Sequence, residues 1–332
     1  MEYEFITLDD ALIGMSKQLL KNGVARGTRG FECIEMREPV LIKICDPTSR
    51  IIKNPARAWS KTLPMAESIW LLNGVNSMHL PGAITKNLYN FSDDGEFMRA
   101  GYGPRIRSFN NSNDDYKIKY PHERLGVDQL RYVVESLIKD PNSRQASITI
   151  HDPNKDNFNP DGSLKTTKDT PCTRTIKFEK KNGKLDCIVS MRSNDLLWGF
   201  SAVNVFNFTL MQEIVSMLVG IPIGNYYHFA ENFHYYKKVE DQIIKIATSY
   251  FKSEHETFHY KGLNNVNFDF FDCALTNVYH SALQLVGGTQ NRYSSLVCQT
   301  TGIDIFDDML LQIFKFKNKS LNGNEFYNNN LN

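Results

Sequence analysis

The sequence predicts an α+β protein in which helices and strands are mixed along one chain. Strand-like segments are too numerous for a helical bundle, and helical segments lie between them. The strongest local signal is a β-hairpin, because Asn182-Gly183 separates the strand-like runs 176–180 and 185–190. No internal repeat is visible, so a repeat architecture is not expected.

The first half of the chain alternates between helical and strand-like segments. Apolar residues at helical spacing predict helices over 8–22 and 64–72, and Asn73-Gly74 ends the second. The other expected elements of this half are a Gly- and Arg-rich loop at 23–30, strands at 31–37 and 39–45, and a turn-rich region at 88–113.

The second half continues in the same mixed way. Helices are predicted at 126–139, which ends before Asp140-Pro141, and at 204–219. The other expected elements are a strand at 146–150, a polar loop at 152–171, the hairpin strands and an aromatic extended segment at 226–236. From about residue 240 onward the segments are helical and mixed.

Length and composition fit one large core. The chain has 332 residues, 41% of them hydrophobic, which is ample for one domain with an extension. A net charge of +1 does not indicate a nucleic-acid-binding protein. The six cysteines show no C-x-x-C spacing, so we expect reduced thiols in a cytoplasm and no metal site. The longest apolar run, around 210–223, is interrupted by Gln212 and Glu213, so no membrane-spanning segment of about 18 residues is expected.

A candidate nucleophile lies at one end of the predicted hairpin. A hairpin brings its outer ends together, so Cys172 and Arg192 should lie close in space. A neighbouring guanidinium favours the thiolate, and a thiolate is a strong nucleophile. The same residues could also be a small buried cysteine and a surface arginine, since free cysteine is often a core residue.

The motifs around this hairpin resemble the thymidylate synthase superfamily. The resemblance rests on Thr170-Pro171-Cys172, the hairpin and Arg192-Ser193-Asn194-Asp195, with Gly199-Phe200 beyond. Cys172 is followed by Thr173, where the synthases usually have histidine, and the pattern is most similar to the phage-type deoxycytidylate hydroxymethylases. The resemblance covers roughly 20–240 and implies a large twisted mixed sheet with packed helices that dimerises through the sheet.

The resemblance also implies a domain organisation. Residues 1–240 would be the catalytic domain. Residues 241–332 would be a C-terminal extension of unassigned role, packed on the same domain. The chain would then act as a homodimer.

The resemblance implies a one-carbon transferase of nucleotide biosynthesis. The Cys172 thiolate would add to C6 of a pyrimidine nucleoside monophosphate, which makes C5 electron-rich. C5 would then attack the one-carbon unit carried by 5,10-methylenetetrahydrofolate and lose its proton. Addition of water gives a hydroxymethyl product, whereas addition of hydride gives a methyl product.

Four residues are candidates for binding the phosphate, because guanidinium forks and hydroxyls match phosphate oxygens. They are Arg26, Arg144, Arg192 and Ser193. Arg26, rather than Arg29, resembles the arginine of the family's phosphate loop. Arg144 resembles an arginine that reaches across a dimer interface into the neighbour's site, although Gln145 replaces the family's second arginine. Each arginine could instead be a solvated surface charge.

Five further residues match family positions. Glu67 lies inside an apolar helix, and a buried carboxylate is protonated, paired or functional; in the family it orders water and relays protons. Tyr102 matches a tyrosine that supports loss of the C5 proton, and Asp195 matches an aspartate that binds the folate ring. His234 and Tyr236 match a pair that binds the sugar hydroxyl, and alternate residues of a strand share one face.

Three departures from the family leave the reaction open. The asparagine that reads the base lies four residues beyond the glycine, where this chain has Val203, and a one-residue shift would bring Asn204 there. No closing tail follows Tyr236, and only Tyr89-Asn90-Phe91 represents the Trp-rich segment beside the folate. The expected function is therefore hydroxymethylation of deoxycytidylate or cytidylate. The alternatives are a thymidylate synthase and an inactive nucleotide-binding homologue.

Overall fold

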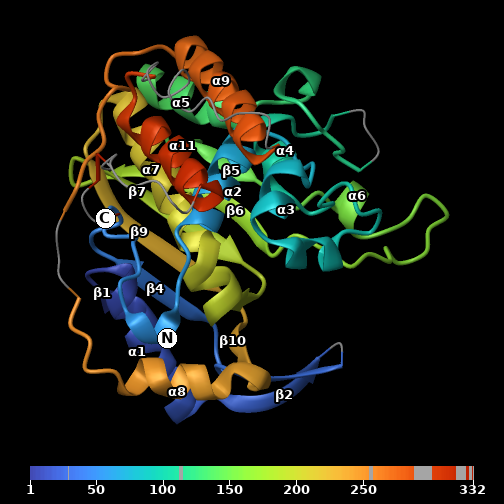
Figure 1. Cartoon of the computed structure of the whole chain (residues 1–332), viewed down its shortest axis with the longest axis vertical. Coiled ribbons are helices and arrows are strands. Elements are labelled where there is room, and N and C mark those ends of the chain that lie inside the picture. Colours follow the sequence, from blue (N-terminus) through green and yellow to red (C-terminus); the bar gives the residue numbers. More distant parts are fainter. Residues whose placement is uncertain are drawn as a thin grey trace. The chain divides into compact units, whose positions relative to one another are not determined.

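The protein has an α+β fold, as predicted (Figure 1). The structure, a computed structural model, describes residues 1–28, 30–111, 115–253, 257–287, 301–318, 327–328 and 331. Arg29 and Cys298 lie outside the described residues. The chain forms two compact units, each assembled from separate segments: unit one is Met1–Ser60, Cys172–Ser216 and Ile221–His259, and unit two is Lys61–Pro171, Met217–Gly220 and Tyr260–Asn332.

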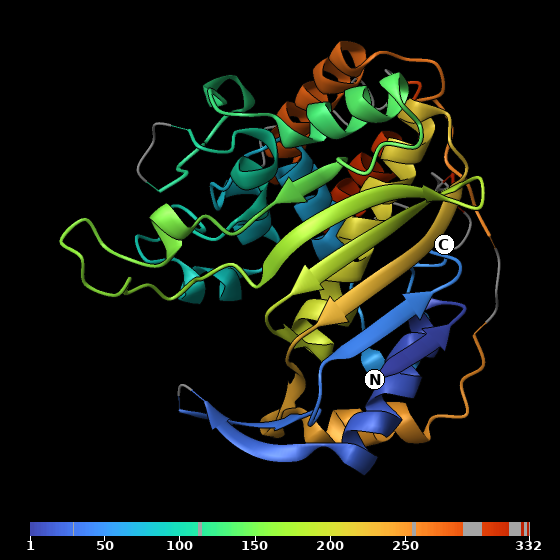
Figure 2. The same ribbon diagram turned by 180° about the vertical axis from the view of Figure 1, so that it is seen from behind.

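Unit one is built on a mixed sheet. Its strands, in spatial order, are β1 (Glu2–Phe5), β4 (Val40–Ile44), β9 (Ile223–Ala230), β7 (Lys184–Met191) and β6 (Thr173–Lys181). The pairs β1–β4 and β7–β9 are parallel, and β4–β9 and β6–β7 are antiparallel. Figure 2 shows these strands side by side, from dark-blue β1 to yellow-green β6. The mixed sheet expected from the resemblance is confirmed.

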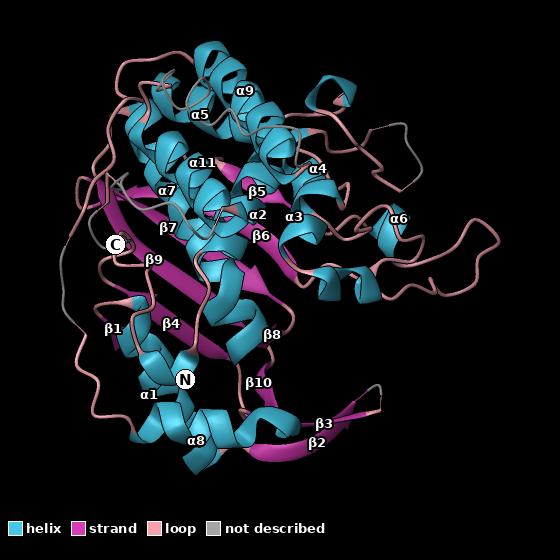
Figure 3. Cartoon of the chain, in the orientation of Figure 1, coloured by secondary structure: helices cyan, strands magenta, loops and turns pink. Residues whose placement is uncertain are grey.

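Two helices of unit one pack against each other. They are α1 (Leu8–Asn22) and α8 (Glu240–Thr248), drawn in cyan in Figure 3. Helix α1 begins where predicted because the Thr7 side chain accepts from the Asp10 N–H, while Asp10 accepts from the Thr7 N–H in return. Its buried residues recur at helical spacing, including Leu8, Leu12 and Leu19.

The predicted hairpin is confirmed as β6 and β7. Asn182 and Gly183 adopt φ values of 50° and 79°, as a two-residue hairpin turn requires. The register shifts between Thr173 and Thr175, so Arg174 is an extra residue on the β6 side. Such a bulge bends the strand and re-aims neighbouring side chains. Arg174 lies two residues beyond Cys172.

A second, smaller sheet belongs to unit one. Its order is β2 (Val24–Thr28), β3 (Phe31–Glu35), β10 (Phe233–Tyr236) and β8 (Asn194–Asp195). The prediction of a loop at 23–30 is wrong, because residues 24–28 pair with β3 along their whole length. Gly27 weakened the strand signal, yet β2 lies at the edge of the sheet, where a glycine is tolerated.

The helix that follows β8 begins with a π-helical segment. Residues Leu196–Asn204 form a π-helix that continues into α7 (Val205–Val219), so the helix begins earlier than the predicted residue 204. The whole span is long and apolar enough to cross a membrane, but 78% of its most apolar window is buried within the protein. We expected Gln212 to interrupt such a run. Instead its amide is buried and donates to the Leu185 and Asn225 carbonyls, at 2.9 and 3.0 Å.

Unit two is mainly helical. Its regular elements are α2 (Thr62–Leu72), α3 (His79–Ile84), α4 (Tyr102–Arg107), α5 (Gln129–Lys139), β5 (Ser147–Thr149), α6 (Pro153–Asp156), α9 (Phe268–Val286) and α11 (Asp304–Lys317). Short 3₁₀ helices complete the two units: η1 (Pro55–Arg57) and η5 (Lys237–Val239) in unit one, and η2 (Lys86–Phe91) and η3 (Pro121–Glu123) in unit two. Helices α4 and α6 lie in ranges predicted as turn-rich or loop. Helix α2 is apolar on all sides because α3, α4, α9 and α11 pack around it.

A buried ion pair links α4 and α6 within unit two. Arg105 donates to Asp156 through two parallel bonds of 2.7 and 2.9 Å, and neither side chain has exposed surface. Arg99 donates to the same carboxylate at 3.1 Å. Burial raises the pKa of Asp156, but the hydrogen bond and charge of Arg105 outweigh it and lower the pKa below its usual value.

Candidate active site

The two ends of the hairpin meet, as the sequence predicted. The Arg192 N–H donates to the Cys172 carbonyl at 2.9 Å. Cys172 is half-buried and directly precedes β6, and Arg192 directly follows β7. The turn and strand pairing therefore hold the thiol-bearing residue beside an arginine.

The smaller sheet gathers the other candidates of unit one on a single face. Directly opposed residues of neighbouring strands share a face, and so do alternate residues of one strand. One cross-strand row contains Asp195, His234 and Glu35, and the next contains Tyr236, Cys33 and Arg26. One residue predicted for the phosphate, Arg26, thus lies on the same face of the sheet as the residues predicted for the sugar and the folate.

His234 and Tyr236 occupy one face of β10, as their spacing predicted. Their rings meet edge to face with centroids 5.4 Å apart. His234 is 7% exposed, and burial lowers its pKa to about 4. Its Nδ1 lies 2.8 Å from Asn232 Oδ1. The imidazole is therefore neutral at pH 7 and oriented by an amide.

Asp195 caps the π-helix with one carboxylate oxygen. Its Oδ1 accepts from the Trp198 N–H, whereas its Oδ2 is buried without a hydrogen-bond partner among the described residues. Burial raises the pKa of Asp195 to about 6, against the lowering effect of the backbone donors. Trp198 is 57% exposed, which is unusual for so large an apolar ring. A buried acceptor and an exposed indole thus lie next to each other.

The π-helix brings Asn204 beside Gly199. The Val205 N–H donates to the Phe200 carbonyl, five residues earlier, so residues five apart share one face of this segment. A side chain at Gly199 would clash with Asn194 Nδ2 and lie 3.1 Å from Asn204 Oδ1. Gly199 therefore makes room for two amides. In a regular α-helix, Val203, four positions beyond Gly199, would lie nearer the face of the helix that carries Gly199.

Arg26 forms an ion pair with a residue that the sequence did not single out. Its Nη1 lies 3.1 Å from Glu35 Oε1, and its side chain is 63% exposed while that of Glu35 is 14% exposed. The other oxygen of Glu35 accepts from Asn232 Nδ2. Glu35 and Asn232 were missed because no short motif marks them. Asn194 lies in the Arg192-Ser193-Asn194-Asp195 motif and Trp198 directly precedes Gly199, but neither residue was assigned a role of its own. The strand register alone places Glu35 opposite His234.

Glu67 and Tyr102 belong to unit two. Glu67 is half-buried on α2 among fully buried neighbours, and Tyr102 begins α4, which packs on α2. The glycines on either side of Tyr102 allow this packing, because a side chain at Gly103 would lie 2.6 Å from the Val75 carbonyl oxygen. The Tyr-Gly turn of the sequence therefore has a steric reason.

The turn before Tyr102 is bonded to the segment that leads to the nucleophile. The Ala100 N–H donates to Asp169 Oδ2 at 2.9 Å, three residues ahead of Cys172 in the chain. Burial raises the pKa of Asp169 to about 6. Asp169 is a further polar residue that the sequence did not single out.

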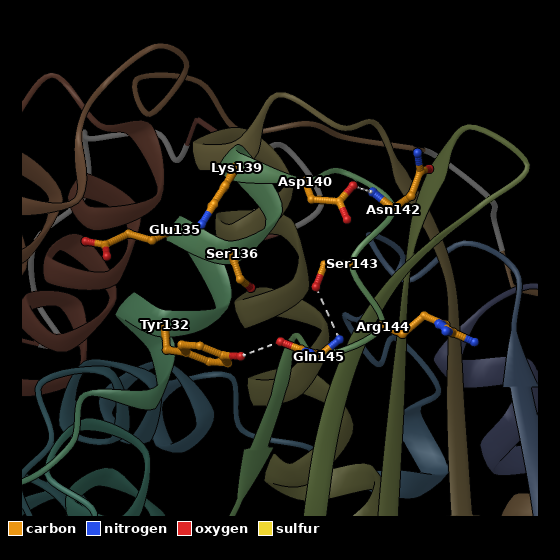
Figure 4. A pocket seen from close by; sticks show the side chains of 9 residues that line it. All are labelled: Tyr132, Glu135, Ser136, Lys139, Asp140, Asn142, Ser143, Arg144 and Gln145. Carbon is orange, nitrogen blue, oxygen red and sulfur yellow. Dashed lines mark hydrogen bonds between the residues drawn. The ribbon is translucent and has the colours of Figure 1, made fainter.

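Arg144 lines a pocket of about 780 Å³ in unit two, formed by the end of α5 and the loop that follows. In Figure 4 the Arg144 side chain extends away from Tyr132 and Gln145, which hydrogen-bond to each other at 3.3 Å. Arg144 is exposed and forms no ion pair with any residue that the structure describes. Its guanidinium is thus available to an anion.

Comparisons with known proteins agree with the motifs around the hairpin. The family model described as thymidylate synthase matches residues 56–280. The chain belongs to the thymidylate synthase family. The resemblance found in the sequence is confirmed, and the match reaches beyond residue 240, so the C-terminal region is not wholly without a family counterpart.

Several curated relatives in this family are named for hydroxymethyl transfer. A deoxyuridylate hydroxymethyltransferase of Bacillus phage SP01 is 36% identical over 233 residues, covering 69% of this chain and 58% of the relative. One of Delftia phage PhiW-14 is 31% identical, covering 63% and 55%. A thymidylate synthase of Bacillus subtilis subsp. natto is 26% identical, covering 67% and 74%. The chain spans less than two thirds of the two hydroxymethyltransferases.

Proposed function

We propose that this chain is a folate-dependent pyrimidine nucleotide C5 hydroxymethyltransferase that acts on deoxyuridylate. The observation that carries the proposal is Cys172, whose carbonyl accepts from the Arg192 N–H at the end of the hairpin in a thymidylate synthase-family chain. The names of the phage relatives favour hydroxymethyl transfer to a uracil nucleotide. This choice replaces the cytosine nucleotide that the sequence motifs favoured.

In this proposal, the residues of unit one divide the work. Cys172 adds to C6 of the base, since a thiolate is a strong nucleophile and covalent addition makes C5 electron-rich. Arg26, Arg192 and Ser193 bind the phosphate through charge-assisted hydrogen bonds. His234 and Tyr236 bind the sugar from their shared face of β10.

Methylenetetrahydrofolate supplies the one-carbon unit in this proposal, and the structure offers residues that fit it. The buried, unpartnered Oδ2 of Asp195 can accept from an N–H group of a folate ring. The exposed indole of Trp198 can pack on the flat face of the same ring. Glu67 and Tyr102 of unit two are proposed to order water and assist loss of the C5 proton.

The base is read by Asn204 in this proposal. The π-helical segment supports this role, because residues five apart share a face there and Asn204 lies beside Gly199. A carboxamide can donate to O4 and accept from N3–H of uracil, whereas a carboxylate only accepts and suits the amino group of cytosine.

Changing Asn204→Asp is expected to lower kcat/KM for deoxyuridylate by about 100-fold, since two hydrogen bonds of roughly 1.4 kcal/mol each are affected. The ratio of kcat/KM for deoxycytidylate to that for deoxyuridylate should rise. Steady-state kinetics with both nucleotides measure this ratio. Asn207→Asp is not a suitable control, because Asn207 is also buried. Asn159→Asp, in an exposed loop of unit two, is the matched control. An unchanged ratio in Asn204→Asp would remove Asn204 from base recognition.

The function is tested by product mass. Purified protein is incubated with methylenetetrahydrofolate and, in turn, UMP, dUMP, CMP and dCMP. We expect dUMP to gain a hydroxymethyl group while tetrahydrofolate is released unoxidised. A methylated product with stoichiometric dihydrofolate, seen as its absorbance band, would instead identify a thymidylate synthase. No covalent adduct with 5-fluoro-deoxyuridylate and folate would indicate an inactive nucleotide-binding homologue.

We propose that the chain acts as a homodimer in the cytoplasm, with Arg144 serving the partner's phosphate site. Its exposed guanidinium and open pocket support this role. Mixing inactive Arg144→Ala chains with inactive Cys172→Ala chains should restore about a quarter of the activity, because one site of each hybrid dimer has both residues. Lack of rescue despite measured subunit exchange would rule out a shared site.

We further propose that residues 241–332 complete the catalytic domain. Their described helices α9 and α11 pack on α2, which carries Glu67.

A further inference from the structure

We propose that Glu35 is a positioning residue that sets, through Asn232, which ring nitrogen of His234 carries the proton. The inference rests on the proposed function, because it specifies whether His234 donates or accepts in its hydrogen bond to the sugar of the nucleotide. Neither Glu35 nor Asn232 belongs to a sequence motif of the site.

The three side chains form one hydrogen-bonded chain in unit one. Glu35 Oε2 accepts from Asn232 Nδ2, and Asn232 Oδ1 lies 2.8 Å from His234 Nδ1. Strand pairing supports this arrangement, since β3 places Glu35 directly opposite His234 on β10. These side chains are largely shielded from solvent, because the Glu35 side chain is 14% exposed and His234 is 7% exposed.

The direction of each hydrogen bond among these three side chains follows from the carboxylate of Glu35. A carboxylate paired with an arginine accepts hydrogen bonds and donates none, so the Asn232 amide must turn its NH₂ group toward Glu35. The amide oxygen then faces His234, and an oxygen can only accept. His234 must therefore donate from Nδ1.

The other ring nitrogen is then fixed as an acceptor. Burial lowers the pKa of His234 to about 4, so the ring is neutral near pH 7 and carries one proton only. With that proton on Nδ1, Nε2 presents a lone pair. It can accept from a hydroxyl that donates, such as the 3′-hydroxyl of a nucleotide sugar, and it cannot donate to an ether or carbonyl oxygen.

The same carboxylate also holds Arg26. Glu35 Oε1 lies 3.1 Å from Arg26 Nη1, so its two oxygens serve a phosphate-binding residue and a sugar-binding residue at once. Glu35 therefore joins the two ends of the proposed nucleotide site through side chains alone. A substitution of Glu35 should affect both ends, whereas substitution of Asn232 should affect the sugar end only.

The first test reads the tautomer directly in the protein without nucleotide. Two-bond ¹H–¹⁵N correlation spectra distinguish the Nδ1–H from the Nε2–H form, and the His234→Gln variant identifies the signal among the eight histidines. We expect Nδ1–H in the wild type. In Glu35→Gln the new amide can donate to Asn232, which lets Asn232 reverse and moves His234 wholly or partly to Nε2–H. A dominant Nε2–H form in the wild type would overturn the inference.

The second test measures binding of dUMP and of its 2′,3′-dideoxy analogue. We expect the wild type to bind dUMP about 10-fold more tightly, the equivalent of one hydrogen bond of roughly 1.4 kcal/mol. The preference should fall to below about 3-fold in Glu35→Gln and persist in the control Glu32→Gln, which removes the same charge from the opposite face of β3. An unchanged preference in Glu35→Gln would contradict the inference. Failure of the wild type to bind dUMP would contradict the proposed function instead, and the spectra would still decide the tautomer.

Discussion

Replacing Cys172 with alanine is expected to lower turnover by a factor on the order of 10⁴ or more, the loss seen when a covalent nucleophile is removed. Alanine removes the thiol but leaves the backbone bond from Arg192, because that bond is made by the Cys172 carbonyl. The residues of unit one that are proposed to bind the phosphate and the sugar remain in place. Deoxyuridylate should therefore bind the variant with nearly unchanged affinity, measured by calorimetry beside single-turnover kinetics.

The control for this substitution is Cys273→Ala. Cys273 is an exposed free cysteine on α9 of unit two and has no proposed role in the site. Its loss should leave both turnover and binding within about twofold of wild type, since exposed substitutions away from a site have small effects. Turnover by Cys172→Ala above one hundredth of the wild-type rate would show that another group forms the covalent bond or that none is needed.

Replacing Asp156 with asparagine is expected to have the largest effect on stability, a loss of about 3–5 kcal/mol in the free energy of unfolding. Arg105 is fully buried and relies on this carboxylate for two hydrogen bonds, and Arg99 donates to it as well. The variant leaves Arg105 in a low-dielectric interior without the counter-charge of Asp156, while Arg99 keeps its ion pair with Asp115. Urea unfolding followed by circular dichroism measures the change.

The pH dependence of the free energy of unfolding provides a second test of the ion pair between Arg105 and Asp156. Because the pKa of Asp156 is lowered in the folded protein, its contribution is fully present above its ordinary pKa of about 3.8 and is lost as pH falls through the folded value. Asp156→Asn should show a weaker loss of stability than wild type over this acid range. Asp161→Asn, in an exposed loop, is the control and should leave the free energy of unfolding nearly unchanged. A loss below 1 kcal/mol in Asp156→Asn would show that water or movement of Arg105 compensates.

The elements that follow from local sequence were the ones predicted well. The Asn182-Gly183 turn fixes a two-residue hairpin, and that hairpin alone brings Cys172 to Arg192. The Thr7 cap likewise fixes the start of α1. Each of these depends on residues within a few positions of one another, so a pattern in the chain is sufficient.

Features that depend on distant partners were missed. Strand β2 exists because β3 pairs with it, although its own residues read as a loop. Asn204 was one residue away from the family position, and only the π-helical hydrogen bonding shows which face it occupies. Glu35 and Asn232 form a hydrogen bond although they are 197 positions apart in the chain. Such contacts leave no local pattern, because their spacing is set by the fold.

The interleaving of the two units has a consequence for how the protein is made on the ribosome. Helix α2 is completed early, yet the residues that cover it come from α9 and α11, and the Asn73 amide donates to the Leu275 carbonyl at 3.2 Å. Gln312 donates to Thr62 across an even longer stretch of chain, at 2.6 Å. During synthesis at roughly 5–20 residues per second, α2 must therefore wait for tens of seconds or less with an apolar surface uncovered. In that interval the nascent chain exposes this apolar surface to chaperones and proteases, until α9 and α11 have been synthesised and can pack on α2.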